Sequence, residues 1–169
     1  MAESSAGSMR KAPELAINAS NGKEILLSQY TGKVVAIEFI RTTCPHCQAS
    51  SKFMSALQSK YGAQGFQVLA AAVNPDSNLL VENFVKDYQV NFPVGWLSPE
   101  QVQTFMQFSS SYFVVPQLAL VDRSGMIRFQ TPAKEDQSWD ELMKQENLVK
   151  DIELLLTEKN IKAHKSRGN

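Results

Sequence analysis

The two cysteines of the chain lie three residues apart, in the segment Cys44-Pro45-His46-Cys47. Two thiols at this spacing can form a disulfide, supply two ligands of a metal site, or fill a core. Two cysteines are too few for a disulfide framework or a four-cysteine zinc site. Redox exchange, a partial metal site and two inert core thiols are therefore the hypotheses to weigh.

Cys44 is expected to cap the start of a helix. Pro45 would occupy the first helical position, where its missing N–H costs nothing and its fixed φ suits the turn. The free N–H groups of the helix start then point at the Cys44 sulfur and, with the helix dipole, favour its thiolate. We therefore expect Cys44 to attack a disulfide. Cys47, one turn on and more buried, would resolve the mixed disulfide.

His46 lies between the two cysteines and has two interpretations. Its ring N–H or protonated imidazole would stabilise the thiolate, and a stabilised reduced form makes such a pair a stronger oxidant. The alternative is an exposed histidine without a role. For a metal site, only His46 and His164 could add nitrogen ligands, so carboxylates or a second chain would have to complete it. We favour redox exchange, with no metal and no cofactor besides the disulfide.

Buried strands and a helix are predicted to hold this turn. Residues 33–40 (K-V-V-A-I-E-F-I) and 66–73 (F-Q-V-L-A-A-A-V) are apolar runs typical of strands buried on both faces. Between them, residues 50–61 follow a helical pattern that ends at Gly62 and Gly65. This order predicts a parallel strand–helix–strand crossover. The cysteines then lie at the connection between the first strand and the helix that follows it.

Further elements are predicted on both sides of this unit. Residues 12–32 suggest a small hairpin that turns at Asn21-Gly22. A helix is expected after Asp76, and a short extended segment follows at residues 92–94. The helix should carry four residues on one inward face: Leu80, Phe84, Val85 and Tyr88.

The C-terminal part is predicted to hold a short helix from Ser98, a strand hairpin and a last helix. Residues 117–121 and 126–130 flank Asp122-Arg123-Ser124-Gly125, a strong hairpin signal. The last helix should open with a capping box at Ser138. Its inward residues are predicted to be Trp139, Leu142, Val149, Ile152 and Leu156. Together the elements predict an α/β domain with a mixed central sheet flanked by helices.

Composition and charge limit the classes of function. A chain of 169 residues, 43% of them hydrophobic, suffices for one domain. We place this domain at residues 12–160, between a flexible N-terminus (1–11) and a flexible basic tail (161–169). The net charge is zero, so nothing indicates nucleic-acid binding. Serine-hydrolase, phosphate-loop and dinucleotide motifs are absent.

The sequence shows no recognisable targeting signal, and this leads to an expectation about location. No apolar run has the length of a membrane span, and the first residues lack the apolar segment of a signal peptide. As written, the chain is expected in the cytoplasm. If its first residue is not the native start, a periplasmic or other extracytoplasmic location is expected instead.

Four stretches carry a family resemblance: A-P-E-L (12–15), N-G-K-E-I-L-L-S-Q-Y-T-G-K-V-V-A-I-E-F (21–39), C-P-H-C (44–47) and V-V-P-Q-L-A-L-V-D-R-S-G-M-I (114–127). Over residues 12–157 the chain resembles the TlpA/ResA group of thioredoxin-like thiol-disulfide oxidoreductases. The resemblance implies a thioredoxin-like fold with an N-terminal β-hairpin and a central insertion. It also implies that the chain exchanges a Cys44–Cys47 disulfide with protein thiols. A redox partner protein and a monomeric state are expected with this activity.

The resemblance implies two further site features. Val115-Pro116 matches the cis-proline of the family, whose backbone lies against the disulfide and pairs with an extended substrate segment. Glu38 matches a buried carboxylate beneath the resolving cysteine. An acid in an apolar run should have a raised pKa, as a general base for Cys47 needs. A solvated edge position or a lysine partner is the alternative for Glu38.

The sequence departs from the family around Cys44. Pro45-His46 is the dipeptide of DsbA-type oxidases, whereas the loops resemble TlpA-type proteins, which are commonly reductases, so the two features favour opposite directions of electron flow. Arg41-Thr42-Thr43 stands where a tryptophan usually precedes the first cysteine. Arg41 either adds positive charge there or is merely exposed.

Tyr112 and Phe113 are predicted to be core residues, with a substrate groove as the alternative.

Two other functions use the same residues. A peroxiredoxin-like thiol peroxidase would share the frame, but its threonine belongs three residues before the reactive cysteine, where Arg41 stands. A metal chaperone or redox sensor would use Cys44 and Cys47 as ligands, carry metal and show no turnover. Protein thiol-disulfide exchange is the function we expect.

Overall fold

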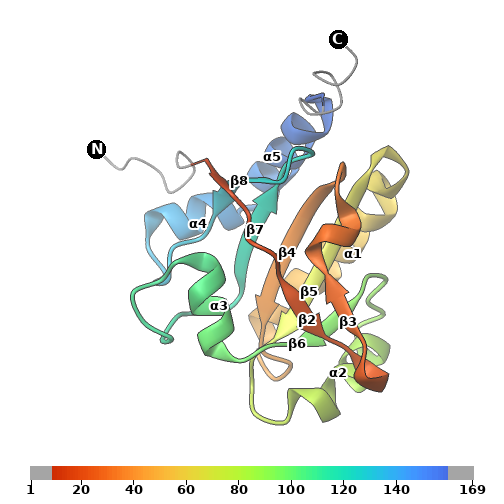
Figure 1. The fold of residues 1–169 in the computed structure, drawn as a ribbon, viewed down its shortest axis with the longest axis vertical. Helices are drawn as coiled ribbons and strands as arrows, with labels where there is room; N and C mark the ends of the chain where they lie inside the picture. Colours follow the sequence, from red (N-terminus) through yellow and green to blue (C-terminus); the bar gives the residue numbers. More distant parts are fainter. Residues whose placement is uncertain (1–8, 160–169) are drawn as a thin grey trace.

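Strand β4 (Val34–Ile40) lies at the centre of the sheet. The computed structural model describes residues 9–159, and in it eight strands form one mixed sheet in the order β1-β8-β7-β4-β5-β6-β2-β3 (Figure 1). β4 pairs in parallel with β5 (Phe66–Ala72) and antiparallel with β7 (Gln117–Val121). All seven residues of β4 are buried. The predicted strand that is covered on both faces is therefore confirmed.

The outer strands extend the sheet on both sides. β8 (Met126–Gln130) forms the predicted hairpin with β7. On the other side, β6 (Val94–Trp96) pairs in parallel with β5. The predicted N-terminal hairpin consists of β2 (Ala16–Asn18) and β3 (Glu24–Leu26), and β2 pairs with β6. The hairpin is therefore a continuation of the main sheet.

Strand β1 (Arg10–Lys11) lies within the segment 1–11 that was expected to be flexible. It pairs with β8 at the edge of the sheet. The Arg10 guanidinium also donates hydrogen bonds of 2.7 Å to the carbonyl of Phe105 and to the Gln130 side chain. Residues 10 and 11 therefore belong to the folded domain. The predictions for residues 1–8 and for the basic tail 161–169, with His164, lie outside the described residues.

The helices cover the two faces of the sheet unequally. Because side chains alternate along a strand, Val34, Ala36 and Ile40 point to one face of β4 and Val35, Ile37 and Phe39 to the other. The first face packs against four helices: α1 (Pro45–Tyr61), α2 (Ser77–Asp87), α4 (Gln137–Met143) and α5 (Gln145–Thr157). The second face packs against α3 (Pro99–Met106), whose predicted start at Ser98 is confirmed, and against N-terminal segments.

Helix α2 has a different inward face from the predicted one. Ser77, Val81 and Phe84 are buried, whereas Leu80 is 36% exposed. The residues at i, i+4 and i+7 share one face, and Leu80 lies about 100° away from it around the helix. Leu80 was therefore placed wrongly, and Val81 occupies the core position.

The last helical region is two helices. Lys144 has an extended conformation (φ −60°, ψ 131°) and separates α4 from α5. The cap of α4 is Asp136, whose carboxylate accepts a hydrogen bond of 3.0 Å from the N–H of Trp139. The prediction of one helix capped at Ser138 is wrong in both respects. The break also shifts the inward face of α5 to three residues: Leu148, Ile152 and Leu155.

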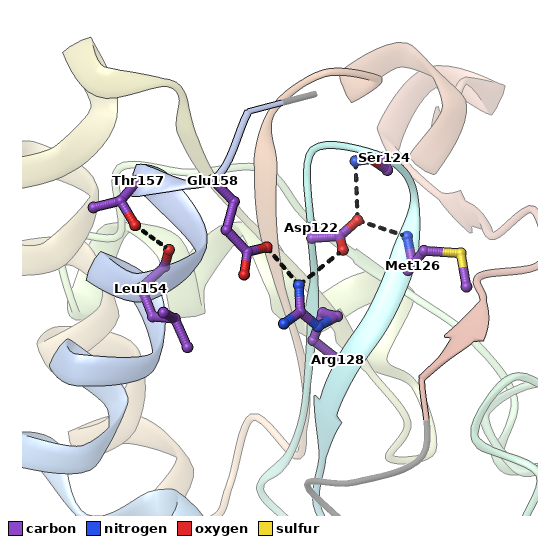
Figure 2. Close-up of polar contacts among 7 residues, drawn as sticks. All are labelled: Asp122, Ser124, Met126, Arg128, Leu154, Thr157 and Glu158. Atoms are coloured by element: carbon purple, nitrogen blue, oxygen red, sulfur yellow. Dashed lines mark hydrogen bonds and ion pairs between the residues drawn. The ribbon is translucent and has the colours of Figure 1, made fainter. Parts of the chain in front are cut away.

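An ion-pair cluster fastens the end of α5 to the β7–β8 hairpin (Figure 2). Arg128 contacts Asp122 at 3.2 Å and Glu158 at 2.5 Å. The other Asp122 oxygen accepts hydrogen bonds from the N–H groups of Ser124 and Met126, both at 2.9 Å. Because β7 runs antiparallel to β4, this cluster lies at the end of the sheet opposite to Cys44.

None of the helices in residues 9–159 combines the length and the apolar character that a membrane span requires.

Gly95 in β6 has no space for a side chain. A Cβ there would overlap the carbonyl oxygen of Asn18 and the Ile17 side chain on β2. Gly95→Ala should push the β2–β3 hairpin away and lower the free energy of unfolding by about 2–3 kcal/mol, as measured by denaturant unfolding. Gly62→Ala is the control, because among residues 9–159 its Cβ would meet only the Gln58 side-chain amide, at 3.1 Å, and no backbone atom. Equal unfolding midpoints for the two variants would contradict this packing.

Candidate active site

Cys44 caps the first turn of α1, as predicted. Its Sγ accepts a hydrogen bond of 3.3 Å from the N–H of Cys47, and Pro45 follows at the first helical position. Cys44 is half-buried, whereas Cys47 is fully buried, and both are free thiols. One sulfur is therefore open to an incoming disulfide, and the second lies one turn behind it.

The segment before Cys44 is held by side chains from two other elements. The buried Thr42 donates its N–H to the side-chain Oδ1 of Asn74 at 3.0 Å, and the side-chain Nδ2 of Asn74 donates to the Thr42 hydroxyl at 2.8 Å. Gln48 of α1 donates to the Thr42 carbonyl at 3.0 Å. Arg41, at the start of this segment, is exposed. Asn74, which follows β5, thus fixes the approach to the cysteine.

Glu38 lies on the face of β4 that α1 covers, and its side chain is completely buried. The Ser50 hydroxyl donates to one carboxylate oxygen at 2.5 Å and the Ser51 hydroxyl to the other at 3.0 Å. Burial raises the pKa of Glu38 to about 7, although the two serine hydroxyls act in the opposite direction. The alternatives of a solvated edge position and of a lysine partner are therefore wrong.

The environment of Cys47 opposes its ionisation. Burial is the main reason that the pKa of this thiol is raised, and the hydrogen bond with Cys44 and the charges of Cys44 and Glu38 add to the effect. A resolving cysteine attacks as a thiolate, so its proton has to leave when it is needed. Glu38 is a carboxyl group that can accept a proton near neutral pH from the same side of the sheet.

The loop with Val115 and Pro116 lies at the same end of the sheet as Cys44. Gln117, the next residue, pairs with Phe39 near the end of β4, and the Val115–Pro116 peptide bond is cis. The Gln117 amide donates to the carbonyls of Val114 at 2.8 Å and Pro132 at 2.9 Å. Within residues 9–159, no hydrogen bond involves the backbone N–H or carbonyl of Val115.

Trp139 of α4 contacts both parts of the site. Its indole N–H donates to the carbonyl of Pro116 at 3.2 Å. Its ring centre is 5.5 Å from that of the exposed His46, with an angle of 75° between the rings. The predicted burial of Trp139 is confirmed at 3% exposure, but its two contacts were not predicted.

Sequence reasoning missed several residues that position the site. Ser51 could have been found, because it lies four residues after Cys47 on the same helix face and so beneath the predicted carboxylate. No comparable spacing in the sequence indicated the roles of Asn74 and Gln117. Of the two aromatics before the proline, Phe113 is buried as predicted, whereas Tyr112 is 88% exposed, so its core assignment is wrong.

Two structural observations bear on the metal-binding and peroxidase hypotheses. Across residues 9–159, no group of three or more His, Cys, Asp or Glu side chains is placed to hold a metal ion. The position three residues before Cys44, where a peroxiredoxin has a threonine, carries the exposed Arg41.

Comparison with protein families identifies a match over most of the chain. The family model described as Redoxin matches residues 7–149. The chain belongs to the Redoxin family. Among curated relatives, thiol-disulfide oxidoreductase ResA of Bacillus thuringiensis subsp. konkukian is 28% identical over 120 residues, or 70% of this chain and 65% of the relative. ResA of Bacillus subtilis is 37% identical over 91 residues, or 54% and 50%. The match therefore spans less than two thirds of these relatives.

Solved structures show the same fold. A Chlorobium tepidum crystal structure described as a thiol:disulfide interchange protein DsbE has a TM-score of 0.69 and 27% identity, over 86% of this chain and 95% of the other. A thioredoxin family protein from Chlorobium tepidum TLS has a TM-score of 0.71 at 20% identity, over 89% and 98%. The predicted thioredoxin-like fold is confirmed.

The buried carboxyl makes stability depend on pH. A group whose pKa is raised on folding contributes stability that is present below its unfolded value, here 4.5, and is lost as the pH rises through about 7. Between pH 5 and pH 8, Glu38 should therefore lower the free energy of unfolding by about 2–3 kcal/mol. In Glu38→Gln this part of the pH dependence should vanish, as measured by denaturant unfolding at both pH values. The same pH dependence in both proteins would contradict the assignment.

Proposed function

We propose that this chain is a protein thiol-disulfide oxidoreductase that exchanges a Cys44–Cys47 disulfide with protein thiols and disulfides. The observation that carries the proposal is the first turn of α1, where a half-buried Sγ accepts the N–H of a second, buried cysteine. The relatives named ResA support it. The exchange uses the disulfide itself and no cofactor, and all the residues it needs lie in one chain, so a monomer suffices.

In the reducing direction the cycle has two steps. The Cys44 thiolate attacks a substrate disulfide, which forms a mixed disulfide at Cys44 and releases one substrate thiolate. Cys47 then transfers its proton to Glu38 and attacks the Cys44 sulfur. This closes the Cys44–Cys47 disulfide and releases the second substrate thiolate. Two electrons pass from the chain to the substrate, and the reverse sequence oxidises a substrate dithiol.

Val115 and Pro116 are proposed to bind the substrate beside Cys44. The backbone N–H and carbonyl of Val115 have no partner within residues 9–159, so an extended substrate segment can pair with them. Gln117 keeps this loop in place through its bonds to Val114 and Pro132. The exposed Tyr112 adds an aromatic side chain to the same loop.

The direction of electron flow depends on the redox potential of the pair. His46 in the first turn of α1 is proposed to stabilise the thiolate, which would favour an oxidant. Equilibration with glutathione buffers and trapping of free thiols measures the potential. A value near about −120 mV would indicate a DsbA-like oxidant, and one near about −270 mV a thioredoxin-like reductant.

Replacing each cysteine should give opposite phenotypes. Cys44→Ser should abolish exchange with a disulfide-bonded protein substrate, because the nucleophile is lost. Cys47→Ser should accumulate mixed disulfides at Cys44, because nothing resolves them. Non-reducing gel electrophoresis and mass spectrometry detect the adducts, and the two variants serve as controls for each other. Full exchange by Cys44→Ser would overturn the mechanism, and stoichiometric metal without turnover would favour the metal-binding hypothesis.

A further inference from the structure

Trp139 joins two segments of the site that are distant in the sequence. It donates its indole N–H to the Pro116 carbonyl at 3.2 Å, and its ring lies 5.5 Å from that of His46, edge to face. A buried tryptophan needs one partner for its N–H. The bond to Pro116 already satisfies this requirement. The contact with His46 is an additional one, made by a Trp139 side chain that is only 3% exposed.

The position of Trp139 is fixed from its own backbone. Asp136 caps α4 by accepting the N–H of Trp139 at 3.0 Å, and the Ser138 hydroxyl donates to the same carboxylate oxygen at 2.7 Å. One turn further on, Leu142 is buried in the hydrophobic core between the helices and the sheet. The indole is therefore held at its base by a capped helix and at its N–H by the Pro116 carbonyl.

We propose that Trp139 is a positioning residue of the exchange site, which holds the His46 ring in a fixed place between α1 and the Pro116 loop. This inference deepens the proposed function and rests on it. His46 is exposed, and without this contact its side chain would sample other rotamers. Because electrostatic stabilisation falls with distance, a displaced imidazole would stabilise the Cys44 thiolate less. Trp139 thus acts on the thiol–disulfide equilibrium through His46.

The two contacts of Trp139 can be separated by substitution. Trp139→Phe keeps an aromatic ring for His46 but removes the N–H that bonds Pro116. Trp139→Leu removes both contacts. Leu142→Ala is the matched control, because it removes a buried side chain from the same helix. If Trp139→Leu fails to fold, Trp139→Met takes its place, because methionine fills irregular core space well.

The experiment measures the equilibrium constant between each chain and glutathione at pH 7. Trp139→Leu should favour the disulfide by about threefold or more, in the same direction as His46→Ala. Trp139→Phe and Leu142→Ala should stay within about twofold of the unaltered chain. In the His46→Ala background, Trp139→Leu should add less than about a twofold change, because the residue through which it acts is gone.

Two results would overturn the inference while leaving the proposed function in place. One is a reversible disulfide whose equilibrium Trp139→Leu does not change. The other is a change of equal size with and without His46, which would make Trp139 a general structural residue. If the unaltered chain forms no reversible disulfide with glutathione, the proposed function fails and this inference fails with it.

Discussion

A carboxyl group is buried in the middle of a strand that water cannot reach. All seven residues of β4 are buried, and Glu38 is the charged one among them. Since an unpaired buried charge is costly, its oxygens need hydrogen-bond donors, and Ser50 and Ser51 of α1 supply them. These bonds fix the rotation of α1 against the sheet. Cys47, four residues before Ser51, then faces the same carboxyl group, and Cys44 lies at the helix start.

The segment before Cys44 and the Pro116 loop are both held by hydrogen bonds from residues at the ends of strands. Asn74, after β5, fixes Thr42, and Gln117, at the start of β7, fixes the Pro116 loop. Gln117 is itself bonded to the buried Thr131. The opposite end of the sheet carries the ion pairs of Arg128 with Asp122 and Glu158 (Figure 2). One end of the sheet thus holds reactive groups, while the other fastens the C-terminal helix.

The sequence pattern predicted those parts of the fold that depend on neighbours along the chain. The apolar runs of β4 and β5, the hairpins and the cap at Cys44 follow from local periodicity and turn residues. The inward residue of α2 was wrong because Leu80 and Val81 are both apolar, so only the packing of the helix against the sheet decides between them. The cap of α4 was wrong because Asp136 and Ser138 are both good caps. The contacts of Trp139 could not be predicted, since its partners are brought together by tertiary packing.

The most direct test of the account is the pH dependence of the resolving step. Cys44 is loaded with glutathione as a mixed disulfide, and release of glutathione by Cys47 is followed after a jump in pH. With Glu38 as proton acceptor, the rate should rise through an inflection near pH 7, where this carboxyl group ionises. In Glu38→Gln the inflection should disappear, and the rate at pH 7.5 should fall by about 10²-fold. The same rate profile in both proteins would contradict the account.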